Sequence, residues 1–227
     1  MVRAASFVFA SMLALTVTAR PTPGTECDGD DSAPAAISPE QLIKIDPTTA
    51  TCATTGENAA ECADAARAAP AINASFKTYG ITAPGEQAAL IAIMDFESGG
   101  FKYNKNHFSP EGPRPGQGTR NMQMLPFNIQ YANDVLPTAT AAAAEAAGGD
   151  AVTAALNADD AISFGSAAWF LTKAQPDKCT QQVRDGLAAG TKVGWDAYLT
   201  QCVGTTADPT RDIPWLAAKA ALGVTAV

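Results

Sequence analysis

Residues 84–101 read PGEQAALIAIMDFESGGF, and this stretch determines the predicted fold. Apolar residues surround nearly the whole circumference of a helix over Pro84–Ser98, which indicates a central, buried helix. Glu97 lies three residues after Met94, so helical spacing carries the buried stripe onto the glutamate. Two glycines follow at once, and a glycine at this position can end a helix in the left-handed conformation.

Glu97 is therefore the candidate catalytic residue. Partial burial and the negative end of the helix dipole both disfavour a carboxylate, so they favour the protonated form that a general acid needs. Asp95 lies two positions earlier, hence on another face of the helix, and is not expected to share the site.

Helical signals dominate the rest of the chain. Ser38 is a natural N-cap, Pro39 suits the first turn, and Gln41 completes a capping box. An alanine-rich helix is expected over residues 58–79, broken or kinked near Pro70. Further helices are expected over residues 126–135, 138–147, 150–157, 160–175, 180–189, 192–203 and 212–222.

Residues 101–125 interrupt this helical pattern. Dense Gly and Pro turn signals precede an alternation of polar and apolar residues, which predicts a small β-hairpin. In its second strand Asn121 and Gln123 would share one face, and Met122 and Met124 would point to the other. The predicted fold class is α+β, mostly α, with one small hairpin inserted in a helical domain.

The N-terminus has the pattern of a secretory signal over residues 1–19: a basic start, an apolar stretch and small residues before the cleavage point. Residues 20–36 are rich in Pro, Gly and Asp and are expected to form a flexible linker. Residues 37–227 then form one domain of a secreted, extracellular protein.

The net charge of −8, with no cluster of Lys or Arg, argues against binding to nucleic acid or to an anionic membrane. His107 is the only histidine and is interpreted as a solvated loop residue. We therefore expect no metal site and no cofactor.

The chain has five cysteines and no CxxC motif, which fits disulfides in an exported protein. Pairing of nearest neighbours gives Cys52–Cys62 and Cys179–Cys202 and leaves Cys27 over. The sequence does not determine this connectivity.

Two short blocks resemble a known family. Glu97-Ser98-Gly-Gly-Phe101, followed by Asn121-Met122-Gln123, is similar to the E-S-x-x-F … L-M-Q pattern of goose-type lysozymes and lytic transglycosylases. Residues 85–205 resemble small secreted fungal muramidases of the lysozyme-like superfamily. The resemblance implies a lysozyme-like fold, a catalytic acid at Glu97, and contacts to substrate at four positions. These positions are Ser98, Tyr103, Asn121 and Gln123.

The chain differs from the family pattern at two positions. Arg120 stands where the family usually has the glycine before the L-M-Q unit, and Asn121 stands where it has the leucine. A glycosidase commonly needs a second carboxylate. The candidates are Glu111, Asp134 and Asp160, and spacing does not choose among them.

The predicted function is that of a monomeric muramidase that hydrolyses the β-1,4 bonds between N-acetylmuramic acid and N-acetylglucosamine in bacterial peptidoglycan. One alternative is a chitinase or chitosanase, and the acidic surface would suit the cationic substrate of a chitosanase. The other is a secreted wall-binding effector without catalysis.

Overall fold

Helix α3 (Pro84–Ser98) lies at the centre of the structure, a computed structural model that describes residues 36–108, 110 and 112–225. The described residues form one structural unit. Every residue of α3 from Gly85 to Asp95 is buried. A Cβ atom on Gly85 would lie 2.2 Å from the carbonyl oxygen of Leu187, so only glycine allows α3 to approach this neighbour so closely.

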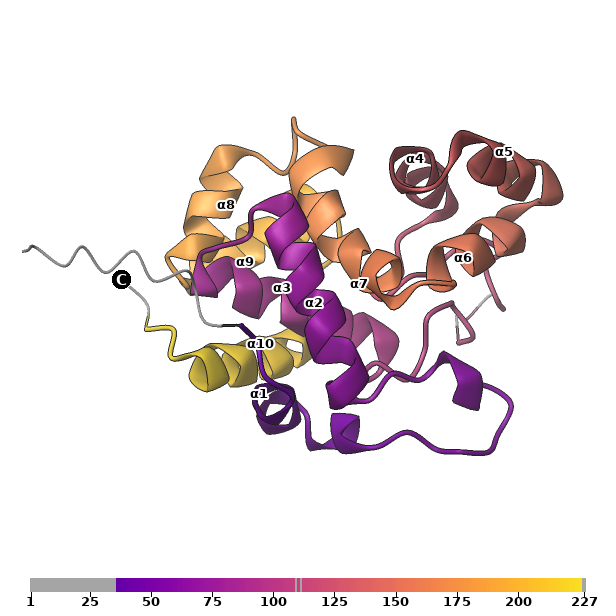
Figure 1. Ribbon diagram of the computed structural model, residues 1–227. Helices are drawn as coiled ribbons and strands as arrows, with labels where there is room; N and C mark the ends of the chain where they lie inside the picture. Colours follow the sequence, from indigo (N-terminus) through magenta and orange to yellow (C-terminus); the bar gives the residue numbers. More distant parts are fainter. Residues whose placement is uncertain (1–35, 109, 111, 226–227) are drawn as a thin grey trace, which may run out of the picture. The chain divides into compact units, whose positions relative to one another are not determined.

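The other helices pack in two groups on either side of α7 (Asp160–Trp169), as Figure 1 shows. In one group α3 contacts α8 (Gln181–Ala188) and α10 (Pro209–Leu222), and α9 (Lys192–Ala197) contacts α8. The second group consists of α4 (Leu125–Val135), α5 (Thr138–Ala147) and α6 (Gly149–Asn157). Helix α2 (Ala65–Tyr79) packs along α7, and α1 (Pro39–Ile45) packs on α10 and α2.

Four short elements complete the structure. Two are 3-10 helices, η1 (Pro47–Ala50) and η2 (Ala59–Glu61). The other two, η3 (Phe170–Ala174) and η4 (Tyr198–Val203), are π-helical extensions of α7 and α9. In the described part of the chain, none of the helices is long and apolar enough to cross a membrane.

Most helix predictions are confirmed. Helix α3 has the predicted bounds, and Ser38 and Gln41 form the predicted capping box. The helix predicted from residue 58 begins only at Ala65, because the side chain of Asp64 accepts the backbone N–H of Arg67 and caps α2 there. Pro70 lies inside α2 without ending it.

The predicted β-hairpin over residues 101–125 is wrong, and the fold is mainly helical. No strand forms among the described residues; this segment has only two isolated bridges, Lys105 with Gly118 and Gly118 with Gln123. Positive φ angles at Phe101 (59°), Thr119 (63°) and Met122 (49°) interrupt the extended backbone that a ladder requires.

The buried side chain of Arg120 replaces part of the expected hydrogen bonding between strands. Its Nη1 donates to the carbonyls of Phe101 (2.9 Å) and Tyr103 (3.2 Å), and its Nη2 donates to the carbonyl of Glu61 (2.8 Å). Two carbonyls of the predicted hairpin, those of Phe101 and Tyr103, are thus bound by a guanidinium instead of by a partner strand. Met124 is exposed.

Both predicted disulfides, Cys52–Cys62 and Cys179–Cys202, are present. They are compatible with the predicted export of the protein. Cys27, the signal peptide and all of the predicted linker except residue 36 lie outside the described residues, and these assignments stay predictions.

Candidate functional site

Glu97 lies in the last turn of α3 and forms an ion pair with Arg211 of α10. Its side chain is 23% exposed, and that of Arg211 is mostly buried. The guanidinium of Arg211 also stacks over the ring of Phe96, with its Cζ 4.3 Å from the ring centroid. A basic partner for this carboxylate was not predicted from the sequence.

A cavity of about 340 Å³ opens beside this ion pair. Glu97 and two residues of segment 117–122 also border a smaller adjoining pocket of about 170 Å³, and we call the two together the Glu97 cleft. The apolar residues that line the larger cavity are Ile93, Met122, Met124, Phe127, Phe170 and Val203. The polar ones include Glu97, Gln117, Asn121, Gln123, Thr205 and Arg211.

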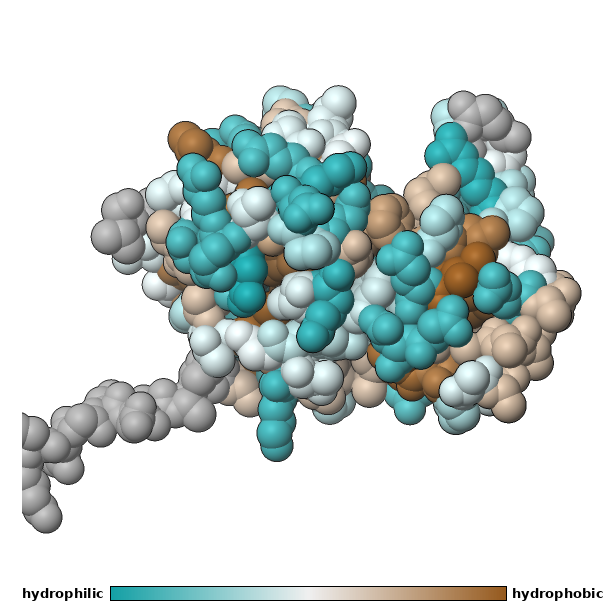
Figure 2. Space-filling view, turned by 90° about the horizontal axis from the view of Figure 1, so that it is seen from above, coloured by the Kyte–Doolittle hydropathy of each residue, from teal (hydrophilic) through white to brown (hydrophobic). Residues whose placement is uncertain are grey.

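The cleft is therefore lined by both apolar and polar side chains. One face of the molecule shows the same mixture at a larger scale, with apolar patches exposed between hydrophilic side chains (Figure 2). Such a lining suits a ligand that has both apolar and polar groups.

A network of amide side chains fixes two of the polar lining residues, Asn121 and Gln123. Gln123 is buried, and its Nε2 donates to Oδ1 of Asn128 at 2.8 Å. Asn128 in turn donates to the carbonyl of Gly116 at 2.8 Å, and Asn121 donates to Oε1 of Gln123 at 3.2 Å. Asn121 and Gln123 were predicted to lie on the same face of a strand, and both do border the cleft. They are held there by the amide network, not by a sheet.

Of the other two predicted contact residues, Tyr103 borders the cleft and Ser98 does not. Ser98 is fully buried: its Oγ donates to the carbonyl of Met94 at 2.6 Å and accepts the N–H of Phe101 at 3.0 Å. It therefore shapes the turn after α3 and does not face a ligand. Tyr103 lies in the smaller pocket of the cleft together with Glu97.

The two described candidates for a second carboxylate lie outside the cleft lining. Asp134 accepts the indole N–H of Trp169 at 2.7 Å. Asp160 accepts two hydrogen bonds from Arg67 of α2. Glu111 lies outside the described residues. The described residues therefore bring neither Asp134 nor Asp160 to Glu97.

Sequence reasoning missed several groups at the site. Arg211 is the ion-pair partner of Glu97, although 114 residues separate them. Tyr198 lines the cleft. Burial raises the pKa of its hydroxyl, and the nearby Glu97 carboxylate adds to this effect. His107 was predicted to be solvated, but its Nε2 binds both carboxylate oxygens of Glu61, at 2.9 and 3.0 Å.

Asp95 carries the clearest electrostatic signal near the site. Burial raises its pKa to about 7, and the nearby carboxylate of Asp46 adds to this effect. Its Oδ1 is buried and has no hydrogen-bond partner. As predicted, it does not line the cleft with Glu97 and instead faces Asp46 and Lys102.

The donor groups of the described residues do not fit a metal centre. No group of three or more His, Cys, Asp or Glu residues is close enough there to hold an ion. His107 is bound to Glu61, and the four described cysteines form disulfides.

No family model matches the chain, and no solved structure matches it. A curated relative from Fusarium oxysporum (strain Fo5176), named bifunctional dioxygenase (DOX)-epoxy alcohol synthase (EAS), is 38% identical over 154 residues. The match covers 63% of this chain but only 11% of the relative. The name therefore describes a much longer protein than the shared stretch.

This comparison overturns the predicted identity. The relative is named as a dioxygenase and epoxy alcohol synthase, not as a lysozyme-like protein, so the predictions of a muramidase, of a glycoside hydrolase and of peptidoglycan as its substrate are wrong. The comparison supports neither a chitinase or chitosanase nor a wall-binding effector.

The motif that suggested the lysozyme-like family has a structural explanation. Ser98 closes the turn after α3, Gly99 and Gly100 adopt positive φ angles of 62° and 70°, and Phe101 is buried. The E-S-x-x-F pattern thus matches what the end of a buried helix requires. So short a pattern does not by itself identify a reaction.

Proposed function

We propose that this chain is a binding module for small, amphipathic organic molecules that carry oxygen groups, of the epoxy alcohol class, and that it holds them in the Glu97 cleft. The observation that carries the proposal is that the Glu97–Arg211 ion pair borders a cavity whose other lining residues are both apolar and polar. Neither dioxygenase nor epoxy alcohol synthase activity is proposed for this chain.

The ligand class follows from the chemistry of the lining together with the name of the relative. An epoxy alcohol has an organic skeleton with an epoxide oxygen, which only accepts hydrogen bonds, and a hydroxyl, which donates and accepts. Arg211 has donors beyond the one that binds Glu97, and the Glu97 carboxylate can accept from a hydroxyl. The six apolar lining residues would cover the skeleton.

The size of the cavity supports the same ligand class. Its volume of about 340 Å³ lies at the lower end of what small-molecule sites require. The amides of Asn121 and Gln123 are already held by their network, so their orientation does not have to be established on binding.

Replacement of Arg211 by methionine is expected to weaken binding of an epoxy alcohol about tenfold or more. Methionine keeps the length and apolar contact of the side chain but removes a charged donor, and a charged hydrogen bond of this kind is worth at least this factor. Isothermal titration calorimetry with an epoxy alcohol, and with the hydrocarbon of equal chain length as the reference ligand, measures the effect.

The matched control is Arg67→Met. Arg67 is also an arginine paired with a carboxylate, but it lies outside the cleft lining and should leave affinity unchanged. If the unmodified protein binds the epoxy alcohol no better than the hydrocarbon, or if both variants weaken binding equally, the proposal is wrong.

A further inference from the structure

Three aromatic rings from one segment form a wall of the Glu97 cleft. The rings of Tyr103, His107 and Phe108 pack edge to face or tilted, with centroids 4.9 to 5.8 Å apart. All three line the smaller pocket of the cleft together with Glu97. Phe108 is exposed, so the wall is not held by burial in the core.

The carboxylate of Glu61 binds this segment at several points. Besides its two contacts with Nε2 of His107, it accepts the backbone N–H of Asn104 at 3.1 Å, and Nζ of Lys105 lies 3.8 Å away. The side chains of Glu61 and His107 are 14% and 17% exposed, so these bonds are partly shielded from water.

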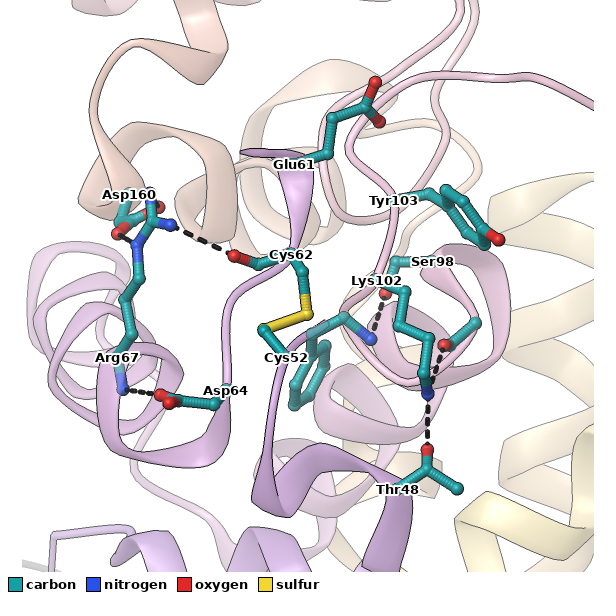
Figure 3. The surroundings of a disulfide bond; sticks show 12 residues. Thr48, Cys52, Glu61, Cys62, Asp64, Arg67, Ser98, Lys102, Tyr103 and Asp160 are labelled. Atoms are coloured by element: carbon teal, nitrogen blue, oxygen red, sulfur yellow. Dashed lines mark hydrogen bonds and ion pairs between the residues drawn. A yellow bond between two sulfur atoms is a disulfide. The ribbon is translucent and has the colours of Figure 1, made fainter. Parts of the chain in front are cut away.

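Glu61 is itself held by the loop that the Cys52–Cys62 disulfide closes. It immediately precedes Cys62, and Figure 3 shows its side chain leaving the chain next to the disulfide. The buried side chain of Arg120 binds this end of the loop through its backbone, because it donates to the carbonyl of Glu61 at 2.8 Å.

A further cavity, outside the Glu97 cleft, borders Tyr103 on another side. It measures about 280 Å³ and lies between Tyr103 and the residues of the disulfide loop. The ring of Tyr103 therefore borders an open space on this side as well as the pocket that contains Glu97. The hydrogen bonds that Glu61 makes to this segment therefore help to fix the position of the ring.

We infer that Glu61 is a positioning residue that fixes the Tyr103–His107–Phe108 wall of the ligand cleft, and that the Cys52–Cys62 disulfide holds Glu61 in place. Ligand affinity is then coupled to a disulfide that does not line the Glu97 cleft. This inference rests on the proposed binding function, which it deepens by naming the structure that preorganises the cleft.

The test compares Glu61→Ala with Glu57→Ala, which removes an exposed carboxylate from the same disulfide loop. Glu61→Ala is expected to weaken binding of an epoxy alcohol about tenfold, because side chains that were already ordered must then be ordered on binding. It should also speed hydrogen exchange of the Asn104 amide, which loses its acceptor. Glu57→Ala should change neither quantity.

A second variant, Cys52→Ser/Cys62→Ser, tests the disulfide without changing Glu61. It should show the same two effects in a protein whose circular dichroism confirms that it is folded. Normal affinity in either variant, or an unchanged exchange rate of the Asn104 amide in Glu61→Ala, overturns the inference. If the unmodified protein binds no epoxy alcohol, the proposed function fails, and the exchange rates alone then decide whether Glu61 positions the wall.

Discussion

Replacement of Arg120 by methionine is expected to lower the free energy of unfolding by about 3 kcal/mol or more. Arg120 is 1% exposed and donates to three backbone carbonyls, those of Glu61, Phe101 and Tyr103. Its guanidinium also lies 4.8 Å from the ring centroid of Phe164. Methionine fills a similar volume but donates no hydrogen bond.

Two effects oppose each other in this variant. Burial leaves the guanidinium of Arg120 poorly solvated and lowers its pKa to about 10, and its removal relieves that unfavourable effect. The loss of three charged hydrogen bonds to buried or partly buried carbonyls is larger, since each contributes about 1.5–3 kcal/mol. The net change is therefore destabilising.

Urea unfolding of the oxidised protein measures the difference. Arg67→Met is the matched control, because the side chain of Arg67 is half exposed and its pairing with Asp160 should contribute no more than about 1 kcal/mol. A loss of stability in Arg120→Met that is no larger than in Arg67→Met would show that these hydrogen bonds do not hold the segment.

Arg120 also explains why residues 101–125 were predicted incorrectly while most helices were predicted well. The bounds of α3 and the cap at Ser38 depend on spacing and hydrogen bonds within a few residues, which a sequence displays directly. The conformation around Arg120 depends on a bond to Glu61, 59 residues away. Alternating polar and apolar residues contain no information about such a partner.

The same distinction applies to the site. Helical periodicity correctly brought Glu97 to the end of a buried helix, and a polar alternation drew attention to Asn121 and Gln123. Arg211 lies 114 residues from Glu97, and the Glu61–His107 contact spans 46 residues. These pairs form only when distant helices and loops pack together, so the sequence predicted half of each pair at most.

Replacement of Asp95 by asparagine is expected to remove a pH dependence of stability between about pH 4 and pH 7. Asp95 is 8% exposed, and burial, together with the nearby Asp46 carboxylate, raises its pKa to about 7, although Lys102 offsets part of the increase. In the unfolded chain an aspartic acid releases its proton near pH 4.

The sign follows from these two values. Below about pH 4 Asp95 is protonated in both states and contributes its full share of stability. As the pH rises, the unfolded chain loses the proton first, so unfolding becomes more favourable until the folded pKa is passed. Each unit of pKa difference corresponds to about 1.4 kcal/mol, so the loss amounts to roughly 2–4 kcal/mol by pH 8.

Asparagine has nearly the same shape but never ionises, so Asp95→Asn should be more stable than the unmodified protein at pH 8 and lose this advantage at pH 4. Urea unfolding at several pH values gives the difference, and effects of other titrating groups cancel in it. Asp177→Asn, at an exposed position, controls for the loss of one negative charge. Parallel stability curves for Asp95→Asn and the unmodified protein would mean that Asp95 is already ionised in the folded state, stabilised by Lys102.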